Sequence, residues 1–143
     1  MTVLRGACHC GHIAIEFATA QAASDLPLRA CDCSFCRRHG AKTTSDPKGK
    51  LRILADTGAI ERYRFGMGVT DFILCRGCGS YIAAMSREGG DELATLNVVG
   101  VAVPEFAARD AAPVNLDHET SDSRRERRRK LWTPAEIVER AAA

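Results

Sequence analysis

The sequence lacks any long apolar stretch. Its longest apolar runs, such as Val98–Val103, are far shorter than the roughly 20 residues that a membrane-spanning helix requires. Residues Met1–Gly6 also lack the charged segment followed by an apolar one that is typical of a signal peptide. The sequence therefore predicts no membrane association, and we expect a cytoplasmic location.

Aromatic residues are also scarce, at 6% of the chain, and none lies within the basic run Arg124–Lys130. Such a run can bind nucleic acid, but stacking on bases would need aromatic side chains nearby. More often a run of this kind is a solvated face or a linker. Nucleic-acid binding is therefore not favoured, and we expect loss of the run to leave an enzyme activity largely intact. Trp132, just after the run, is expected to pack back on the body of the protein.

The cysteines do not suit a disulfide framework, because seven is an odd number. In a reducing compartment, clustered cysteines indicate metal sites. A chain of 143 residues is also long enough to bury a core without covalent staples, and its length is typical of one domain. Metal binding is thus a better explanation of the cysteines than cross-linking.

Most of what the sequence does contain favours β-strands. Alternation in His12–Phe17 places Ile13, Ile15 and Phe17 on one face of a half-buried strand. Further strands are predicted over Leu51–Leu54, Ile60–Phe65, Val69–Leu74, Tyr81–Met85 and Leu93–Val103. The predicted fold class is mainly β.

Helix signals are concentrated at the end of the chain. Thr133 is a candidate N-cap, Pro134 suits the first helical position, and Glu136 would complete a capping box. These residues predict a short C-terminal helix from Thr133 to about Arg140.

The cysteines form three tight groups, each able to hold one ion. They are Cys8 and Cys10, then Cys31, Cys33 and Cys36, then Cys75 and Cys78. Structural zinc prefers four thiolates, whereas catalytic zinc usually has three protein ligands and an open position. Seven ligands divide naturally into a closed site and an open one. The closed site would use Cys8, Cys10, Cys75 and Cys78, and the open site Cys31, Cys33 and Cys36.

Two other interpretations exist. The cysteines could simply be small buried apolar residues, although three tight clusters argue against this. Alternatively, Cys33, Cys36, Cys75 and Cys78 could form one zinc ribbon, which would leave Cys8, Cys10 and Cys31 unexplained. Spacing alone leaves this alternative open.

Metal binding would also change the charge of the protein. The formal net charge of +2 becomes about −1 if seven thiolates hold two zinc ions.

Taken together, the three groups resemble the signature of the glutathione-dependent formaldehyde-activating enzyme family, which includes centromere protein V. The resemblance covers about residues 3–100 and rests on Gly6-x-Cys8-x-Cys10-Gly11, Cys31-x-Cys33-Ser34-x-Cys36-Arg37-Arg38 and Cys75-x-x-Cys78-Gly79-Ser80. It implies a β-tent of small coiled antiparallel sheets, pinned by a structural zinc at the four-cysteine site. It also implies a catalytic zinc at the three-cysteine site, and hence two Zn²⁺ ions per chain.

The resemblance does not extend to the C-terminal third. We therefore divide the chain into a zinc-binding β domain over 1–110 and a segment over 111–143 with the polar stretch, the Arg-rich run and the short helix.

The implied function is that of a carbon–sulfur lyase similar to S-hydroxymethylglutathione synthase. A zinc ion on three thiolates is a poor Lewis acid for water but suits a substrate thiol, whose proton it would displace. The expected substrates are glutathione or a similar small thiol and an aldehyde such as formaldehyde. The alternative is a non-catalytic zinc module that binds nucleic acid or protein through its basic tail.

Three residues beside the open site are candidates for substrate contacts. Arg37 and Arg38 directly follow Cys36 and could pair with substrate carboxylates, although either could equally be surface charge. His39 has an unperturbed pKa that suits proton transfer during addition. The sequence does not indicate an oligomeric state.

Overall fold

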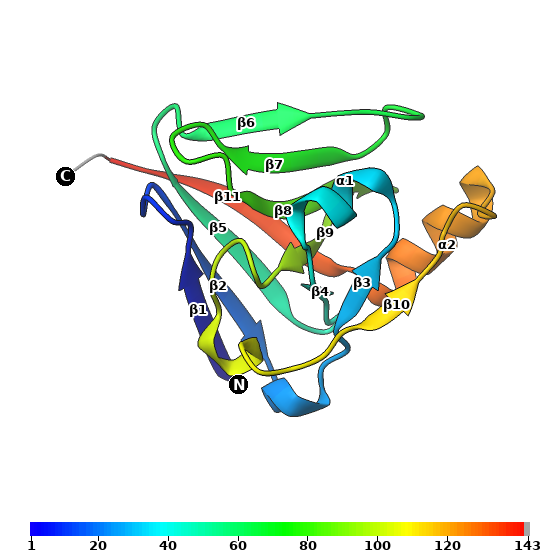
Figure 1. The fold of residues 1–143 in the computed structure, drawn as a ribbon, viewed down its shortest axis with the longest axis horizontal. Helices are drawn as coiled ribbons and strands as arrows, with labels where there is room; N and C mark the ends of the chain where they lie inside the picture. Colours follow the sequence, from blue (N-terminus) through cyan, green and yellow to red (C-terminus); the bar gives the residue numbers. More distant parts are fainter. Residues whose placement is uncertain (142–143) are drawn as a thin grey trace.

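The computed structural model describes residues 1–141 as eleven strands, two short α-helices and two 3-10 turns (Figure 1). The strands are β1 (Thr2–Ala7), β2 (Ile13–Thr19), β3 (Arg29–Cys31), β4 (Thr43–Thr44), β5 (Lys50–Asp56), β6 (Ile60–Tyr63), β7 (Asp71–Cys75), β8 (Tyr81–Glu88), β9 (Asp91–Asn97), β10 (Ala112–Val114) and β11 (Thr133–Arg140). The helices are α1 (Ser34–His39) and α2 (Ser121–Leu131), and the 3-10 turns are η1 (Ala23–Asp25) and η2 (Pro104–Phe106). The predicted mainly β class is confirmed.

The strands form one branched, mixed sheet. On one side, β1, β2 and β5 pair antiparallel, and β11 then joins β5 in parallel. On the other side, β6, β7, β8 and β9 form an antiparallel run, and β9 also pairs with β4, which leads to β3 and β10. Most pairs are antiparallel, as expected, but the β5–β11 and β3–β10 pairs are parallel, so the sheet is mixed.

A short helix in the C-terminal part of the chain is confirmed, but its predicted position at Thr133–Arg140 is wrong, because this segment is strand β11. Its first residues pair with β9, and the remainder, from Ala135 to Arg140, pairs with β5, so β11 connects the two sides of the sheet. Ile137 and Val138 are β-branched and favour a strand. Pairing with β5 supplies the backbone N–H and C=O groups of this segment with the hydrogen-bond partners that they would otherwise find within a helix. Tertiary pairing thus overrides a local capping signal.

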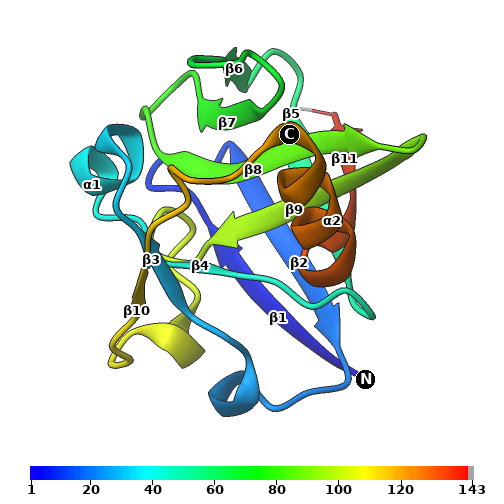
Figure 2. The same ribbon diagram turned by 90° about the vertical axis from the view of Figure 1, so that its right-hand side faces the viewer.

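The helix in the C-terminal part of the chain is α2, which contains the basic run. Thr120 caps it by accepting a hydrogen bond from the Ser123 backbone N–H at 3.1 Å, and the Ser123 hydroxyl accepts one from the Thr120 N–H. Arg, Glu and Lys residues have high helix propensity, which explains why the run is helical rather than irregular. The helix packs over β8, on the side of the molecule that faces the viewer in Figure 2.

The predicted strand over Leu93–Val103 ends early, at Asn97. The buried Asn97 side chain donates to the Tyr81 carbonyl at 2.9 Å and accepts from the Lys42 N–H at 3.2 Å. At Gly100, a Cβ atom would lie 1.9 Å from the same Tyr81 carbonyl oxygen. The chain therefore turns tightly here against the start of β8, which holds Tyr81 in place.

Two groups of buried residues form the core. The larger lies against β2 and β5, where Ile13, Ile15 and Phe17 share the buried face as predicted. The smaller surrounds the beginning of α1 and is made of Cys36, Ala41, Tyr81, Ala84, Leu93 and Trp132. The smaller core is thus built around one of the cysteine groups.

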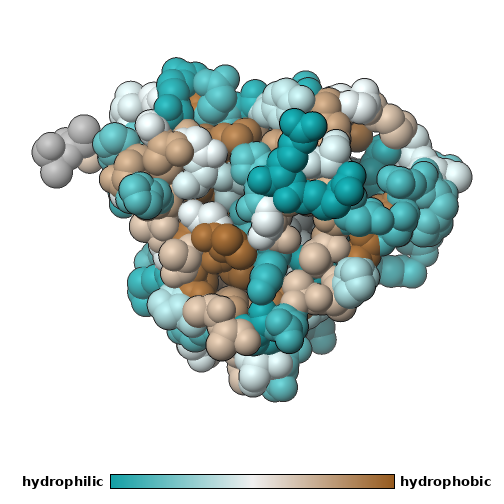
Figure 3. Space-filling model, viewed as in Figure 1, coloured by the Kyte–Doolittle hydropathy of each residue, from teal (hydrophilic) through white to brown (hydrophobic). Residues whose placement is uncertain are grey.

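The surface is mixed in character. In Figure 3, the brown apolar residues lie in several separate groups among hydrophilic ones. Within residues 1–141, neither helix is long and apolar enough to cross a membrane.

Candidate functional site

Four cysteines converge where the β1–β2 turn meets the β7–β8 turn. Their Sγ atoms all lie within 4.8 Å of one another, and we call them the four-cysteine cluster (Cys8, Cys10, Cys75, Cys78). The Cys8–Cys10 and Cys10–Cys75 sulfur distances are 3.7 and 3.5 Å. Tetrahedral zinc with Zn–S bonds near 2.3 Å requires sulfurs about 3.8 Å apart, whereas a disulfide bond is about 2 Å long. The arrangement therefore fits a four-coordinate metal site.

Hydrogen bonds orient these sulfurs. The Ile13 backbone N–H donates to Cys8 Sγ at 3.4 Å, and the Ser80 hydroxyl lies 3.2 Å from Cys78 Sγ. His12, which the sequence places beside this group, has its Nδ1 atom 3.3 Å from Cys10 Sγ. Such outer contacts fix ligand orientation in metal sites.

The sulfurs of this cluster ionise unequally. Burial raises the pKa of the Cys8 thiol and raises that of Cys75 to about 12. Burial also acts to raise the pKa of Cys78, but hydrogen bonds from the Ser80 side chain and backbone lower it to about 5. Sulfurs this close cannot all be thiolates without a cation between them, so the donor set suits a divalent ion.

The remaining cysteines form the three-cysteine cluster (Cys31, Cys33, Cys36), whose Sγ atoms also lie within 4.8 Å of one another. Cys31 ends β3, and Cys33 is the N-cap of α1, where its sulfur accepts the Cys36 N–H at 3.4 Å. Within residues 1–141, no fourth Cys, His, Asp or Glu joins this group. Sequence expectation and structure agree on the four-plus-three grouping, and the ligand roles themselves stay a prediction.

The three-cysteine cluster also suits a cation. A hydrogen bond from Cys36 lowers the pKa of Cys31 to about 6, whereas the same contact and burial raise the pKa of Cys36 well above its ordinary value. Burial, with a smaller contribution from these three cysteines, keeps the pKa of Tyr81 well above its usual range. Tyr81 therefore stays protonated at neutral pH.

A cavity of about 120 Å³ opens beside the three-cysteine cluster, and we call it the cysteine cavity. It is lined by all three cysteines, by Phe72, Ala84, Val114, Leu116 and Trp132, by Tyr81 and three threonines, and by Arg29, Arg127 and Arg128. No described residue in this lining is acidic. The four-cysteine cluster, by contrast, contributes nothing to the cavity.

Arginines from two distant parts of the chain reach the cysteine cavity. Arg127 donates to both carboxylate oxygens of Glu119, at 2.6 and 3.0 Å. The buried Arg128 lies over the Trp132 ring, with its guanidinium carbon 4.3 Å from the ring centre. Burial, and then the charge of Arg127, lowers the pKa of Arg128 to about 10. The basic run is thus not only a solvated face, because two of its arginines turn inward.

The predicted substrate contacts lie elsewhere. Arg37 and Arg38 are exposed at the end of α1 and do not line the cysteine cavity. His39 is half-buried and packs against Phe35 and Tyr81, with ring centroids 4.5 and 5.7 Å away. Roles for these three residues in substrate binding or proton transfer stay a prediction.

Sequence reasoning missed several residues of the cavity wall. The sequence identifies Tyr81 only as the start of a strand and Arg127 and Arg128 only as part of the basic run, and it gives no signal for Arg29. Trp132 was expected to pack back on the body, and this is confirmed, since only 5% of it is exposed.

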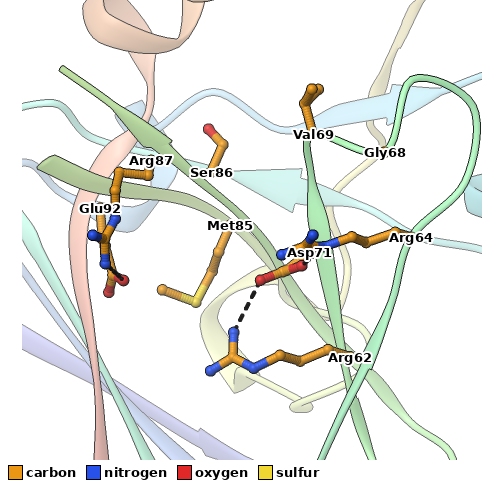
Figure 4. Close-up of a pocket in the computed structure, with 9 residues that line it drawn as sticks. All are labelled: Arg62, Arg64, Gly68, Val69, Asp71, Met85, Ser86, Arg87 and Glu92. Atoms are coloured by element: carbon orange, nitrogen blue, oxygen red, sulfur yellow. Dashed lines mark hydrogen bonds and ion pairs between the residues drawn. The ribbon is translucent and has the colours of Figure 1, made fainter. Parts of the chain in front are cut away.

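A larger hollow, of about 670 Å³, lies between β7 and the β8–β9 hairpin (Figure 4). In Figure 4, Arg62 and Arg64 both reach Asp71, and Arg87 pairs with Glu92 at 3.0 Å. Each of its three arginines thus pairs with one of its two carboxylates, and no cysteine lines it. We therefore place the chemistry in the smaller cysteine cavity.

Comparison with known proteins agrees with this geometry. Residues 3–114 match the family described as glutathione-dependent formaldehyde-activating enzyme. The chain belongs to this family. A crystal structure of a Rhodobacter sphaeroides protein is similar, at 31% identity and a TM-score of 0.57 over 77% of this chain and 98% of that one.

Members of the glutathione-dependent formaldehyde-activating enzyme family condense formaldehyde with glutathione, and the family includes carbon–sulfur lyases. Both cysteine clusters lie within the matched residues. Arg127, Arg128 and Trp132 lie beyond residue 114, so part of the cavity wall comes from outside the family match.

Proposed function

We propose that this protein is a zinc-dependent carbon–sulfur lyase that adds a small thiol reversibly to an aldehyde. The observation that carries the proposal is the three-cysteine cluster, which lacks a fourth side-chain ligand among the described residues and opens into a cavity. A closed structural site would use a fourth side chain, as the four-cysteine cluster does.

The reaction needs no oxidant or further cofactor. A carbon–sulfur bond forms between the thiol and the aldehyde carbon, the carbonyl π bond breaks, and the thiol proton ends on the former carbonyl oxygen. Zinc held by Cys31, Cys33 and Cys36 would keep an open position and bind a substrate thiol in its deprotonated, nucleophilic form. The reverse direction cleaves the carbon–sulfur bond.

The protein's own side chains would then orient the aldehyde. Tyr81 lines the cavity beside all three cysteines and remains protonated, so it is suited to donate a hydrogen bond to the oxygen on which charge develops. Phe72 and Trp132 supply apolar walls that limit access of water. We propose this positioning role for Tyr81 in place of the exposed arginines of α1.

The size of the cavity limits what it can enclose. At about 120 Å³ the cavity, which is open to solvent on one side, is somewhat smaller than a dry cavity of about 150 Å³ that accommodates benzene. Formaldehyde and the thiol end of glutathione fit, but the rest of a tripeptide would have to lie outside. The thiol therefore either extends out of the cavity or is smaller than glutathione.

The non-catalytic alternative has less support. Arg127 and Arg128 face the cysteine cavity, Lys130 pairs with Glu126 at 2.8 Å, and Arg125 lies 3.6 Å from Asp122. The basic helix therefore offers fewer free cations than its sequence suggests. A cytoplasmic location also belongs to the proposal, because free clustered cysteines need a reducing compartment.

Thiol binding tests the proposal directly. We would load the protein with Co²⁺, titrate it with glutathione, and follow the metal–thiolate absorption band. The expected result is a saturable spectral change together with faster exchange between formaldehyde and its glutathione adduct, measured by NMR. No spectral change at millimolar thiol would overturn the proposal.

The matched control is Cys33→Ser, which removes one ligand of the open site and leaves the four-cysteine cluster intact. This variant should lose both the spectral response and the exchange activity. If it kept them, the three-cysteine cluster would not be the site of the reaction.

A further inference from the structure

We infer that the aldehyde carries a short apolar chain that lies against the wall of the cysteine cavity. The protein would then accelerate the reaction of aldehydes with about three or four carbon atoms more than that of formaldehyde. The inference rests on the proposed function for the reaction, but the fit of the chain can also be measured with compounds that do not react. It identifies the class of aldehyde, which the cysteine clusters alone do not.

The first observation is the apolar character of the cavity wall. Besides the cysteines, five apolar side chains line the cavity, and its surface is mainly apolar. These side chains are Phe72, Ala84, Val114, Leu116 and Trp132. Ala84 and Trp132 also belong to the smaller core, so this wall is part of a packed region of the molecule. An apolar chain that enters therefore exchanges contact with water for contact with carbon, which is favourable.

The charged groups of the wall already have partners outside the cavity. Each of its three arginines contacts a residue that does not line it: Glu119 for Arg127, Glu88 for Arg128 and Ser45 for Arg29. The hydroxyl of Thr95 likewise donates to the Thr44 carbonyl, at 3.3 Å. These groups are held by the fold, so the substituent of the aldehyde need not be polar to satisfy them.

The second observation is an irregularity in β8 that places Tyr81 and Ala84 on the same wall. Successive residues of a strand alternate between its two faces, so Tyr81 and Ala84 would normally face opposite ways. The register between β7 and β8 is shifted here, because Leu74 pairs with Tyr81 rather than with Ile82. This bulge brings Tyr81 and Ala84 to the cavity together. Because we place the aldehyde oxygen at Tyr81, the carbon substituent would extend toward Ala84 and its pairing neighbour Phe72.

The size of the cavity sets the length of the chain. A cavity somewhat smaller than one that accommodates benzene has room for about four or five non-hydrogen atoms. Propanal and butanal have this size, whereas formaldehyde would leave most of the space to water. Since one side of the cavity is open to solvent, the last carbons of a longer chain would project into water and gain nothing from burial.

The thiol is the less suitable carrier of this chain. Glutathione, the thiol in the description of this family, is a charged peptide that is too large for the cavity. Its sulfur would take the open position at the three-cysteine cluster, and the rest of the peptide would lie outside. The apolar wall beside Tyr81 is then left for the aldehyde.

A series of straight-chain aldehydes from formaldehyde to hexanal tests the inference. With glutathione as the thiol, NMR would measure the exchange of each aldehyde with its adduct, relative to the uncatalysed exchange of the same aldehyde. We expect this ratio to rise about fourfold for each carbon added up to butanal, because each added methylene is buried, and to level off beyond it. A parallel series of alkyl thiols with formaldehyde should show no such rise.

Two substitutions should move the preferred length in opposite directions. Ala84→Val fills part of the cavity and should move the preference toward shorter aldehydes, whereas Leu116→Ala, at a half-buried position, enlarges the cavity and should move it toward longer ones. The control is Leu131→Ala, which truncates an exposed leucine that does not line the cavity and should leave the preferred length unchanged. Circular dichroism would confirm that each variant is folded.

Binding without reaction provides an independent readout. Butyramide has the chain of butanal but cannot form the adduct. In NMR spectra it should shift the methyl signals of Val114 and Leu116 saturably, at concentrations at which formamide leaves them in place. Failure of the proposed function would appear as no exchange with any aldehyde while butyramide still shifts these signals.

Three results would overturn the inference and leave the proposed function standing. The first is equal acceleration of every aldehyde from formaldehyde to butanal. The second is a preferred length that neither Ala84→Val nor Leu116→Ala moves. The third is a rise with chain length in the thiol series instead, which would assign the apolar chain to the thiol.

Discussion

At the scale of single residues, the two cysteine clusters differ in what surrounds them. The four-cysteine cluster ties two turns together, and Cys8 and Cys75 are buried in the main core. The three-cysteine cluster lies at the start of a six-residue helix and borders a cavity. Metal at the first should therefore support folding, and metal at the second should support chemistry.

Substitution of one ligand in each cluster tests this division. Cys78→Ser should prevent stable folding, because the binding energy of a structural metal is part of the folding free energy. Cys33→Ser should stay folded and lose one metal ion per chain. Circular dichroism and elemental analysis would measure the two effects, and a folded, soluble Cys78→Ser protein would contradict the assignment.

Tyr81→Phe tests the role of the phenol without disturbing its ring. The ring packs edge-on to Phe35, with centroids 5.0 Å apart, and this contact is retained in the variant. We expect thiol binding to be unchanged and the exchange rate to fall about a hundredfold, as when one donor to a developing oxyanion is removed. Unchanged turnover would remove Tyr81 from the mechanism.

At this scale, the sequence was informative about metal binding, because the spacing of the cysteines indicates which sulfurs can share one ion. Cysteines two or three residues apart can place their sulfurs close together, so the three local groups could be anticipated. That Cys8 and Cys10 meet Cys75 and Cys78 was decided by the fold. The positions of Arg128 and Tyr81 in the cavity wall carry no such local signal, since they depend on elements that meet only in the folded protein.

At the scale of elements, the C-terminal segment is where local signals and structure disagree. The Thr133–Pro134 sequence resembles a helix start, yet β11 extends the sheet between β5 and β9. The Arg-rich run, which looks like an exposed charged segment, is a helix with one face in the cavity wall. In both cases contacts with neighbouring elements decided the structure: β5 and β9 pair with β11, and β8 packs against α2.

A proline in β11 should reveal how much the sheet depends on this strand. Ile137 pairs with Ile53 of β5 and packs against the main core. Ile137→Pro removes a backbone donor and fixes φ, and we expect a loss of about 3 kcal/mol in the free energy of unfolding. The control Ile137→Thr keeps the β-branched shape and should cost only about 1 kcal/mol. Urea denaturation would measure both, and equal effects would argue against a required β11 ladder.

At the scale of the whole molecule, the sheet places the two clusters in different settings within one fold. The β7–β8 hairpin connects them, because Cys75 ends β7 and Tyr81 begins β8. Loss of the structural site should therefore also disturb the cysteine cavity, whereas the reverse need not hold.

Metal removal tests this asymmetry. Gently purified protein should contain two zinc ions per chain, and a mild chelator should remove the ion of the three-cysteine cluster first, with no change in circular dichroism. Removal of the second ion should unfold the protein, because thiolates gathered at these distances repel one another without a cation. Acidification should act in the same direction, since protons compete with the metal for the thiolates. A single zinc ion that resists replenishment would contradict the two-site arrangement.

The mainly β class, the buried face of β2 and the three local groups of cysteines follow from the sequence, because alternation and short spacing act between near neighbours in the chain. The four-plus-three division left a zinc ribbon open until the fold showed which turns meet. The fold was needed to show that residues 133–140 form a strand, that the basic run lines a cavity, and that Arg128 lies buried over Trp132. Those outcomes depend on contacts between segments far apart in sequence, whose free energy exceeds the small local preferences that a pattern can record.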